Sequence, residues 1–115
     1  MNDKDCTSKF EAIRHKIAED EFEFSKHAVD QSILRLIRVN EIKEAIANGQ
    51  LIEDYPQDKY GPSCLISGKT LLGRTIHVQC SYPSRALIKI ITVYEPNPKL
   101  WNKDFTIRRN KSNDE

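Results

Sequence analysis

Residues 74–94 read RTIHVQCSYPSRALIKIITVY and decide the fold of the second half of the chain. Polar and apolar residues alternate from 74 to 81, as in a strand with one buried face. The apolar face carries Ile76, Val78 and Cys80, and the opposite face carries Thr75, His77 and Gln79. A turn at 82–85 follows. Residues 87–94 are apolar on both faces apart from Lys89 and Thr92, which predicts the central strand of a sheet.

Turn residues separate two further strands before position 74. We predict these strands at 51–55 and 63–67, joined by the turn-rich segment 56–62, Pro-Gln-Asp-Lys-Tyr-Gly-Pro. A short strand at 21–25 places Phe22 and Phe24 on one face. These segments predict a compact, mainly antiparallel sheet of four to five strands.

Helical periodicity dominates the first half of the chain. The capping-box spacing after Ser8 predicts a helix over 8–19. Ser25 is expected to cap a second helix over 27–37, with a buried stripe formed by Ala28 or Val29, Ile33, Leu34 and Ile37. Asn40 is expected to cap a third helix, which ends in a left-handed stop at Asn48-Gly49. The fold class is therefore α+β, with N-terminal helices packed on the sheet.

Composition is that of one folded domain, with a core at about 8–109 and a frayed tail at 110–115. Apolar residues make up 38% of the chain and charged residues 30%, which excludes a disordered chain. The net charge of +1 gives no global field that could hold a polyanion. Any nucleic-acid site must therefore be a local patch, and the most basic stretch lies between Lys99 and Lys111.

Targeting and cysteine signals point to the cytoplasm. The N-terminus lacks a basic run followed by an apolar stretch, and no apolar segment approaches the roughly 20 residues that span a bilayer. Cys6, Cys64 and Cys80 are odd in number and widely separated, as in a reducing compartment. Their spacing does not indicate a metal site, and we expect Cys64 and Cys80 to face the core.

Short motifs along most of the chain, from about residue 22 to 109, resemble one bacterial family. The motifs are Phe24-Ser25-Lys26-His27-Ala28, Arg35, Ile37, Glu41-Ile42, Gly49, Ile52, Tyr55-Pro56, Gly61-Pro62-Ser63, Gly73-Arg74, Ile76-His77-Val78, Ile91-Thr92-Val93-Tyr94, Pro96, Trp101 and Arg108. The family is catalogued only as a domain of unknown function, and it looks like a relative of the RelE/ParE/BrnT toxin-like fold. The resemblance implies helices on one face of an antiparallel sheet, with the other face open to a ligand or partner.

Three positions depart from the pattern of that family. The helix that usually reads His-Ala-x-x-Arg-Met has Gln31 and Ser32 at its last two positions, and Leu36 replaces the usual Gly. Characterised relatives of the toxin-like fold cut messenger RNA on the ribosome or inhibit gyrase, and a small antitoxin neutralises them. Fold alone does not transfer such an activity.

Metal-independent cleavage of RNA, with no cofactor, needs a base, an acid and a cation for the phosphorane charge. The predicted catalytic candidates are His77, Arg74, Tyr94, Lys89 and Arg108, and the supporting ones are His27, Arg35 and Trp101. His77 is the strongest candidate because alternation points it away from the main core. It can equally make a cross-strand hydrogen bond or lie exposed.

Each other candidate also has a structural interpretation. His27 can cap a helix, Arg35 can pair with Glu41, and Tyr94 can pack its ring in the core. Trp101 with Phe105 is expected to dock the C-terminal segment onto the domain. Arg74, after Gly73 and beside His77, has the stronger phosphate-binding case.

The leading functional prediction is a toxin-like endoribonuclease, with an antitoxin, RNA or the ribosome as partner. A non-catalytic module that uses the same sheet face to bind protein or nucleic acid is the alternative, and the near-neutral charge favours it. An accessory structural domain is the third possibility. The sequence leaves the oligomeric state open.

Overall fold

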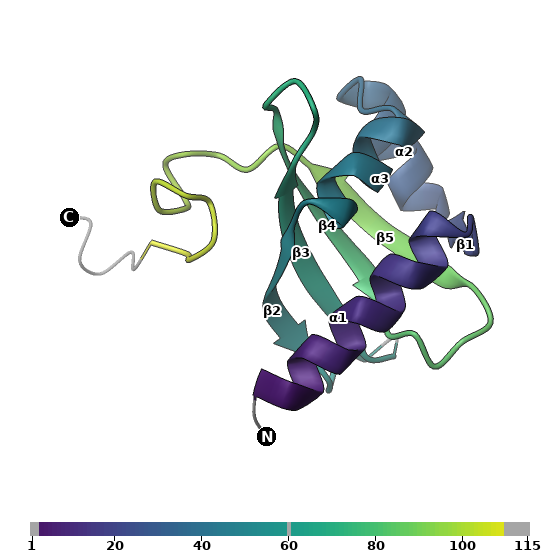
Figure 1. Ribbon diagram of the computed structural model, residues 1–115. Helices are drawn as coiled ribbons and strands as arrows, with labels where there is room; N and C mark the ends of the chain where they lie inside the picture. The colour runs from purple at the N-terminus through teal and green to yellow at the C-terminus, as the bar shows by residue number, and fades with distance from the viewer. Residues whose placement is uncertain (1–2, 60, 110–115) are drawn as a thin grey trace.

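The computed structural model describes residues 3–59 and 61–109, which form an α+β fold (Figure 1). The prediction of a frayed tail at 110–115 lies outside the described residues. The elements follow in the order α1 (Asp3–Ala18), β1 (Phe22–Phe24), α2 (Lys26–Leu34), α3 (Val39–Ala47), β2 (Gln50–Tyr55), β3 (Ser63–Lys69), β4 (Thr75–Ser81) and β5 (Ile88–Tyr94). The predicted fold class is confirmed, with three helices and five strands in the described residues.

The strands form one mixed sheet in the order β1-β5-β4-β3-β2. Three of the four pairings are antiparallel, whereas β1 runs parallel to β5 with Phe22 opposite Ile88. The central strand is therefore β4, and the prediction that residues 87–94 form the middle of the sheet is wrong. β5 is apolar on both faces because it is also an interior strand, with neighbours on both sides.

Helices α1 and α3 cover one face of the sheet, and the core lies between the two layers (Figure 1). Ile13 and Ile17 of α1 and Ile42 and Ile46 of α3 are buried against the apolar faces of the strands. Cys64 and Cys80 are cross-strand partners in this layer and are fully buried, as predicted. Each fully buried isoleucine contributes about 1.5–3 kcal/mol, so this layer supplies most of the stability.

The helix boundaries correct several predictions. α1 begins at Asp3, so Ser8 lies inside the helix and does not cap it. α2 ends at Leu34, and α3 begins after Arg38 instead of Asn40. Of the predicted stripe of α2, Ala28 and Ile37 are buried, whereas Val29, Ile33 and Leu34 are 40%, 67% and 75% exposed. The stripe fails because α2 lies at the sheet edge, mainly against β5, where few of its side chains reach the core.

Left-handed residues follow α1 at Asp20, with φ 62°, and α2 at Leu36, with φ 56°, whereas the predicted left-handed stop at Gly49 is wrong. Gly49 serves close packing instead, because a Cβ there would lie 2.4 Å from the Ser67 carbonyl oxygen and 2.5 Å from that of Ala45. Gly68 meets the same carbonyl of Ala45 from the sheet side. The two glycines let the end of α3 rest directly on β3.

After β5 the chain leaves the sheet and crosses to its other face, away from α1 and α3 (Figure 1). There Trp101 and Arg108 form an antiparallel bridge, and the Asn102 side-chain oxygen accepts the backbone N–H groups of Thr106 and Ile107. We call residues 96–109 the C-terminal strap. As predicted, Trp101 docks this segment, since it is only 2% exposed.

Candidate functional site

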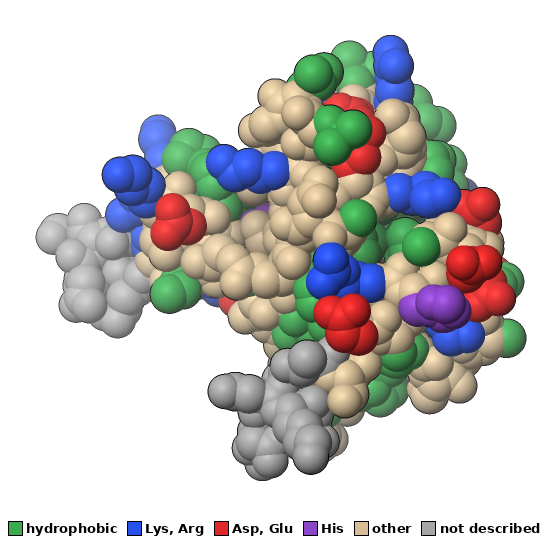
Figure 2. Space-filling model, viewed as in Figure 1, with side chains coloured by type: hydrophobic (Ala, Val, Ile, Leu, Met, Phe, Trp, Pro, Cys, Tyr) green, Lys and Arg blue, Asp and Glu red, His purple; other side chains and the backbone are tan. Residues whose placement is uncertain are grey.

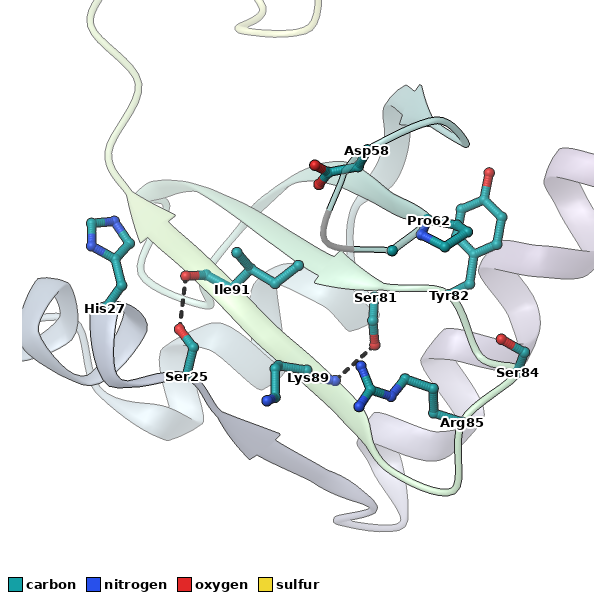
Figure 3. Close-up of a pocket in the computed structure, with 11 residues that line it drawn as sticks. Ser25, His27, Asp58, Pro62, Ser81, Tyr82, Ser84, Arg85, Lys89 and Ile91 are labelled. Carbon is teal, nitrogen blue, oxygen red and sulfur yellow. Dashed lines mark hydrogen bonds between the residues drawn. The ribbon is translucent and has the colours of Figure 1, made fainter.

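A cleft of about 590 Å³ opens on the sheet face that α1 and α3 leave uncovered (Figure 3). We call it the main cleft. Its walls come from the start of α2, the loop before β3, the loop after β4 and the strand β5. The side chains that matter for its chemistry are Ser25, His27, Asp58, Ser81, Arg85 and Lys89.

Ser25 fixes the first turn of α2 against β5. Its Oγ accepts the backbone N–H of Ala28 at 3.0 Å, which is the predicted N-cap, and donates to the Ile91 carbonyl oxygen at 3.0 Å (Figure 3). The Ser25 N–H also donates to the Ile90 carbonyl at 2.9 Å. The cap therefore ties α2 to the sheet, and it sets the exposed ring of His27 at the edge of the cleft.

The floor of the cleft is formed by β4 and β5. The Lys89 N–H donates to Ser81 Oγ at 2.9 Å, so the two residues are held on neighbouring strands. The register between β4 and β5 shifts after Gln79. Gln79 pairs with Thr92, whereas the next residue of β4, Cys80, pairs with Ile90. Ile91 is the extra residue of this bulge and lines the cleft.

The opposite wall carries the acidic residue Asp58. Its Oδ2 accepts a hydrogen bond from Ser63 Oγ at 3.0 Å, and Ser63 in turn accepts one from Gln79 Nε2 at 3.0 Å. This chain of hydrogen bonds joins the loop before β3 to the floor of the sheet. These hydrogen bonds therefore hold the Asp58 wall of the cleft in a fixed orientation.

Three basic side chains, His27, Arg85 and Lys89, face one acidic side chain, Asp58, in the main cleft (Figure 3). Within the described part of the chain, neither Arg85 nor Lys89 forms an ion pair or a side-chain hydrogen bond. Glu23 of β1 is the register partner of Lys89 and adds one more carboxylate nearby. The cleft keeps cationic groups free for an anionic ligand.

His77 lies on the predicted sheet face but is fully buried, because the C-terminal strap covers it. Its Nε2 lies 2.7 Å from the Phe105 carbonyl oxygen and must donate to it, while Nδ1 accepts the Tyr94 hydroxyl at 3.1 Å. The Trp101 ring packs edge-on at 4.5 Å. Burial lowers the pKa of His77 and raises that of Tyr94. The cross-strand hydrogen bond that sequence analysis left open is therefore present, and His77 is not accessible.

Arg74 is held entirely by protein groups. Its guanidinium donates to Glu95 at 2.7 Å, to Glu41 at 3.1 Å, and to the carbonyl oxygens of Leu36 and Arg35 at 2.9 and 3.0 Å. The hydrogen bond to Glu95 and the one to Glu41 raise the pKa of Arg74. Arg74 thus makes the ion pair with Glu41 that was considered for Arg35. Arg74 therefore connects the loop after α2 to α3 through Glu41 and to the end of β5 through Glu95.

A second cleft of about 390 Å³ lies at the other end of β5, and four of the predicted residues line it: Arg35, Tyr94, Trp101 and Arg108. Arg108 pairs with Glu53 at 2.8 Å and stacks over the Trp101 ring at 4.6 Å. Arg35 hydrogen-bonds Gln31 one turn earlier in α2. The predicted site residues therefore divide between two clefts, with His77 behind the strap and Arg74 in an internal network.

Sequence analysis missed Arg85, Asp58 and Ser81 as parts of a site. Arg85 lies in the Tyr-Pro-Ser-Arg segment, which was interpreted only as a turn. A cation in a turn before a buried strand was the available signal, since binding residues often lie on loops held by a rigid scaffold. Asp58 gave no such signal, because Asp is common in turns.

The described residues contain no group of three or more His, Cys, Asp or Glu side chains placed to hold a metal ion. No described helix is both long enough and apolar enough to cross a membrane. The chemistry of the clefts therefore has to be argued from the polar and charged side chains named above.

Comparison with known families identifies one match, which covers residues 24–95. Its description is a domain of unknown function, DUF4258. The chain belongs to this family. The match runs from β1 to just past β5 and includes every described element that builds the main cleft. No curated protein and no solved structure matches the chain.

Proposed function

We propose that this member of the DUF4258 family binds RNA, with the phosphate backbone in the main cleft. The observation that carries the proposal is that two cations, Arg85 and Lys89, have no side-chain partner among the described residues and lie in one cleft with the exposed imidazole of His27. Arginine and lysine are the usual ligands of phosphate oxygens, and hydroxyls such as that of Ser84 add further hydrogen bonds.

The distribution of charge over the molecule agrees with this location. On the face covered by α1 and α3, Lys and Arg side chains are interspersed with Asp and Glu (Figure 2). Examples are the pairs Lys9–Asp54 and Lys43–Asp20. With a net charge of only +1, a polyanion needs a local excess of unpaired cations. The main cleft offers one.

The direct test is the affinity of labelled RNA for the wild-type chain and for the double variant Arg85→Ala/Lys89→Ala, measured by fluorescence anisotropy at several salt concentrations. We expect affinity to fall by about tenfold or more and the slope of log K against log salt to decrease by about 1.4, since each phosphate contact on a single strand contributes about 0.7. Lys26→Ala is the matched control, because Lys26 is 90% exposed and pairs with Asp30. Absence of wild-type binding at low salt, or equal loss in the control, would contradict the proposal.

A second candidate function is the toxin-like endoribonuclease, with a RelE/ParE/BrnT-type relationship. Specific support comes from His27, an accessible imidazole in the same cleft as two cations. In this reaction His27 removes the proton from a 2′-hydroxyl, and the 2′-oxygen attacks the adjacent phosphorus. Arg85 stabilises the phosphorane charge, and Lys89 protonates the departing 5′-oxygen. The products are a 2′,3′-cyclic phosphate and a 5′-hydroxyl.

This candidate differs from the RNA-binding proposal in a measurable way. His27→Ala should abolish cleavage and growth arrest on expression while RNA affinity changes little. His77→Gln is the comparison, because His77 is buried away from the main cleft. If the wild-type chain neither cleaves RNA nor arrests growth, with or without ribosomes, the nuclease candidate fails and with it the need for an antitoxin partner.

A further inference from the structure

The main cleft and the second cleft are lined by residues from opposite ends of the same two segments, 25–35 around α2 and 89–95 around β5. Building on the RNA-binding proposal, we propose that the ligand is a single strand of several nucleotides that occupies both clefts, with Arg35 as the phosphate contact in the second. The family description assigns neither this length nor this contact, and sequence analysis named Arg35 only as a supporting residue.

The side chains of α2 connect the two clefts. His27, Gln31 and Arg35 follow at intervals of four residues, which places them on the same side of the helix. His27 lines the main cleft and Arg35 the second cleft. Gln31 lies between them and accepts a hydrogen bond from Arg35. Eight residues at about 1.5 Å each separate His27 from Arg35 by about 12 Å along the helix.

Residues of β5 line the floor of both clefts. Lys89 and Tyr94 line the main and the second cleft, respectively, and five residues at about 3.3 Å each separate them by about 17 Å. Thr92 lies between them and pairs with Gln79 of β4 on this face. Spans of about 12 and 17 Å exceed the distance between neighbouring phosphates, so two adjacent phosphates do not reach both clefts, whereas a strand of several nucleotides can place phosphates further apart in each.

Charge and burial decide which groups of the second cleft contact the strand. Arg35 pairs with no carboxylate among the described residues, whereas Arg108 is neutralised by Glu53. Trp101 is 2% exposed and therefore offers no face for a base to stack on. Tyr94 is half-buried, and its hydroxyl makes a hydrogen bond with His77. The second cleft is accordingly a phosphate contact made by Arg35, and not an aromatic platform.

The sizes of the clefts favour a single strand over a duplex. Volumes of about 590 and 390 Å³ lie in the range of small-molecule pockets, about 300–1,000 Å³, which admit individual nucleotides. A duplex turns its bases inward and can only lay its backbone on a surface. Single strands instead follow a positively charged groove, with site sizes of about 4–16 nucleotides in other folds.

The test measures the affinity of single-stranded RNAs of about 2, 6 and 10 nucleotides, and of a duplex of the longest. We expect affinity to rise from the shortest to the middle length and to be lower for the duplex. Arg35→Gln should weaken the longer strands by about fivefold and leave the shortest unchanged, because only the longer strands reach the second cleft. Arg38→Gln is the matched control on the exposed loop after α2.

These outcomes separate the two proposals. If no RNA binds the wild-type chain, the RNA-binding proposal itself fails. If RNA binds but affinity does not depend on length, if the duplex binds equally well, or if Arg35→Gln behaves like Arg38→Gln, the two-cleft site is wrong and the main cleft alone binds the ligand. We expect both variants to melt at the same temperature, because Arg74 contacts only the backbone of Arg35, which the substitution leaves in place. Equal melting temperatures would show that a loss of affinity does not come from a loss of stability.

Discussion

Leu36 is a strained residue whose replacement by glycine should stabilise the fold. Its φ of 56° lies in the left-handed region, which costs a residue with a Cβ about 1–2 kcal/mol. The side chain is 79% exposed, so its contacts contribute only about a fifth of the 1.5–3 kcal/mol of a buried leucine. Glycine also increases the conformational entropy of the unfolded chain, which lowers the free energy of unfolding by about 0.5 kcal/mol. The net gain for Leu36→Gly is therefore about 0.5 kcal/mol.

Both backbone hydrogen bonds of Leu36 persist in the variant, since its N–H donates to Ile33 and its carbonyl accepts from Arg74. Urea denaturation should give a higher midpoint at unchanged slope, and calorimetry a melting temperature about 2–4 °C higher. The matched control is Leu34→Gly, which is 75% exposed but helical and should lose up to about 1 kcal/mol. A lower melting temperature for Leu36→Gly, or the same sign for both variants, would refute the reasoning.

Three further predictions concern the groups that hold the strap and the loop after α2. Arg74→Ala should cost about 2 kcal/mol in urea denaturation, because Glu41 and two carbonyl oxygens lose their donor, and Arg74→Lys should restore only part of this. Burial lowers the pKa of His77 below its usual 6.5, so the unfolded chain takes up a proton at a higher pH than the folded chain does. The free energy of unfolding should therefore be highest above about pH 6.5 and should fall as the pH drops through the folded-state pKa. His77→Gln should remove that component from a melting-temperature series. Trp101→Ala should release the strap, seen as proteolysis within 96–109 while the sheet stays protected from hydrogen exchange.

The strands could be predicted closely because their signals are local. Alternation and flanking turn residues placed β3, β4 and β5 within two residues of their observed ends. The parallel pairing of β1 with β5 gave no such signal, since it joins residues more than sixty positions apart. Turn chemistry identified Ser25 as a cap, whereas the start of α1 was set five residues too late at Ser8.

The candidate site was harder to predict, because exposure depends on what covers a face. Alternation correctly assigned His77 to the face opposite Ile76 and Val78, but it carried no information on the strap that buries it. Ion pairs between distant segments, such as Arg74 with Glu41, are likewise invisible to spacing. The departure of Leu36 from the usual glycine, in contrast, was a sequence signal with a structural counterpart in its positive φ.

The parallel pairing of β1 with β5 determines when the cleft can form during folding. Residues 22–24 have no partner in the sheet until residues 88–90 are in place, so this pairing closes the longest loop of the sheet. The antiparallel β2, β3 and β4 involve far shorter loops and can assemble first. Ser25 and α2 are anchored through the same late contact with β5. We therefore expect the main cleft to be completed in the last step of folding, so that partly folded chains lack it.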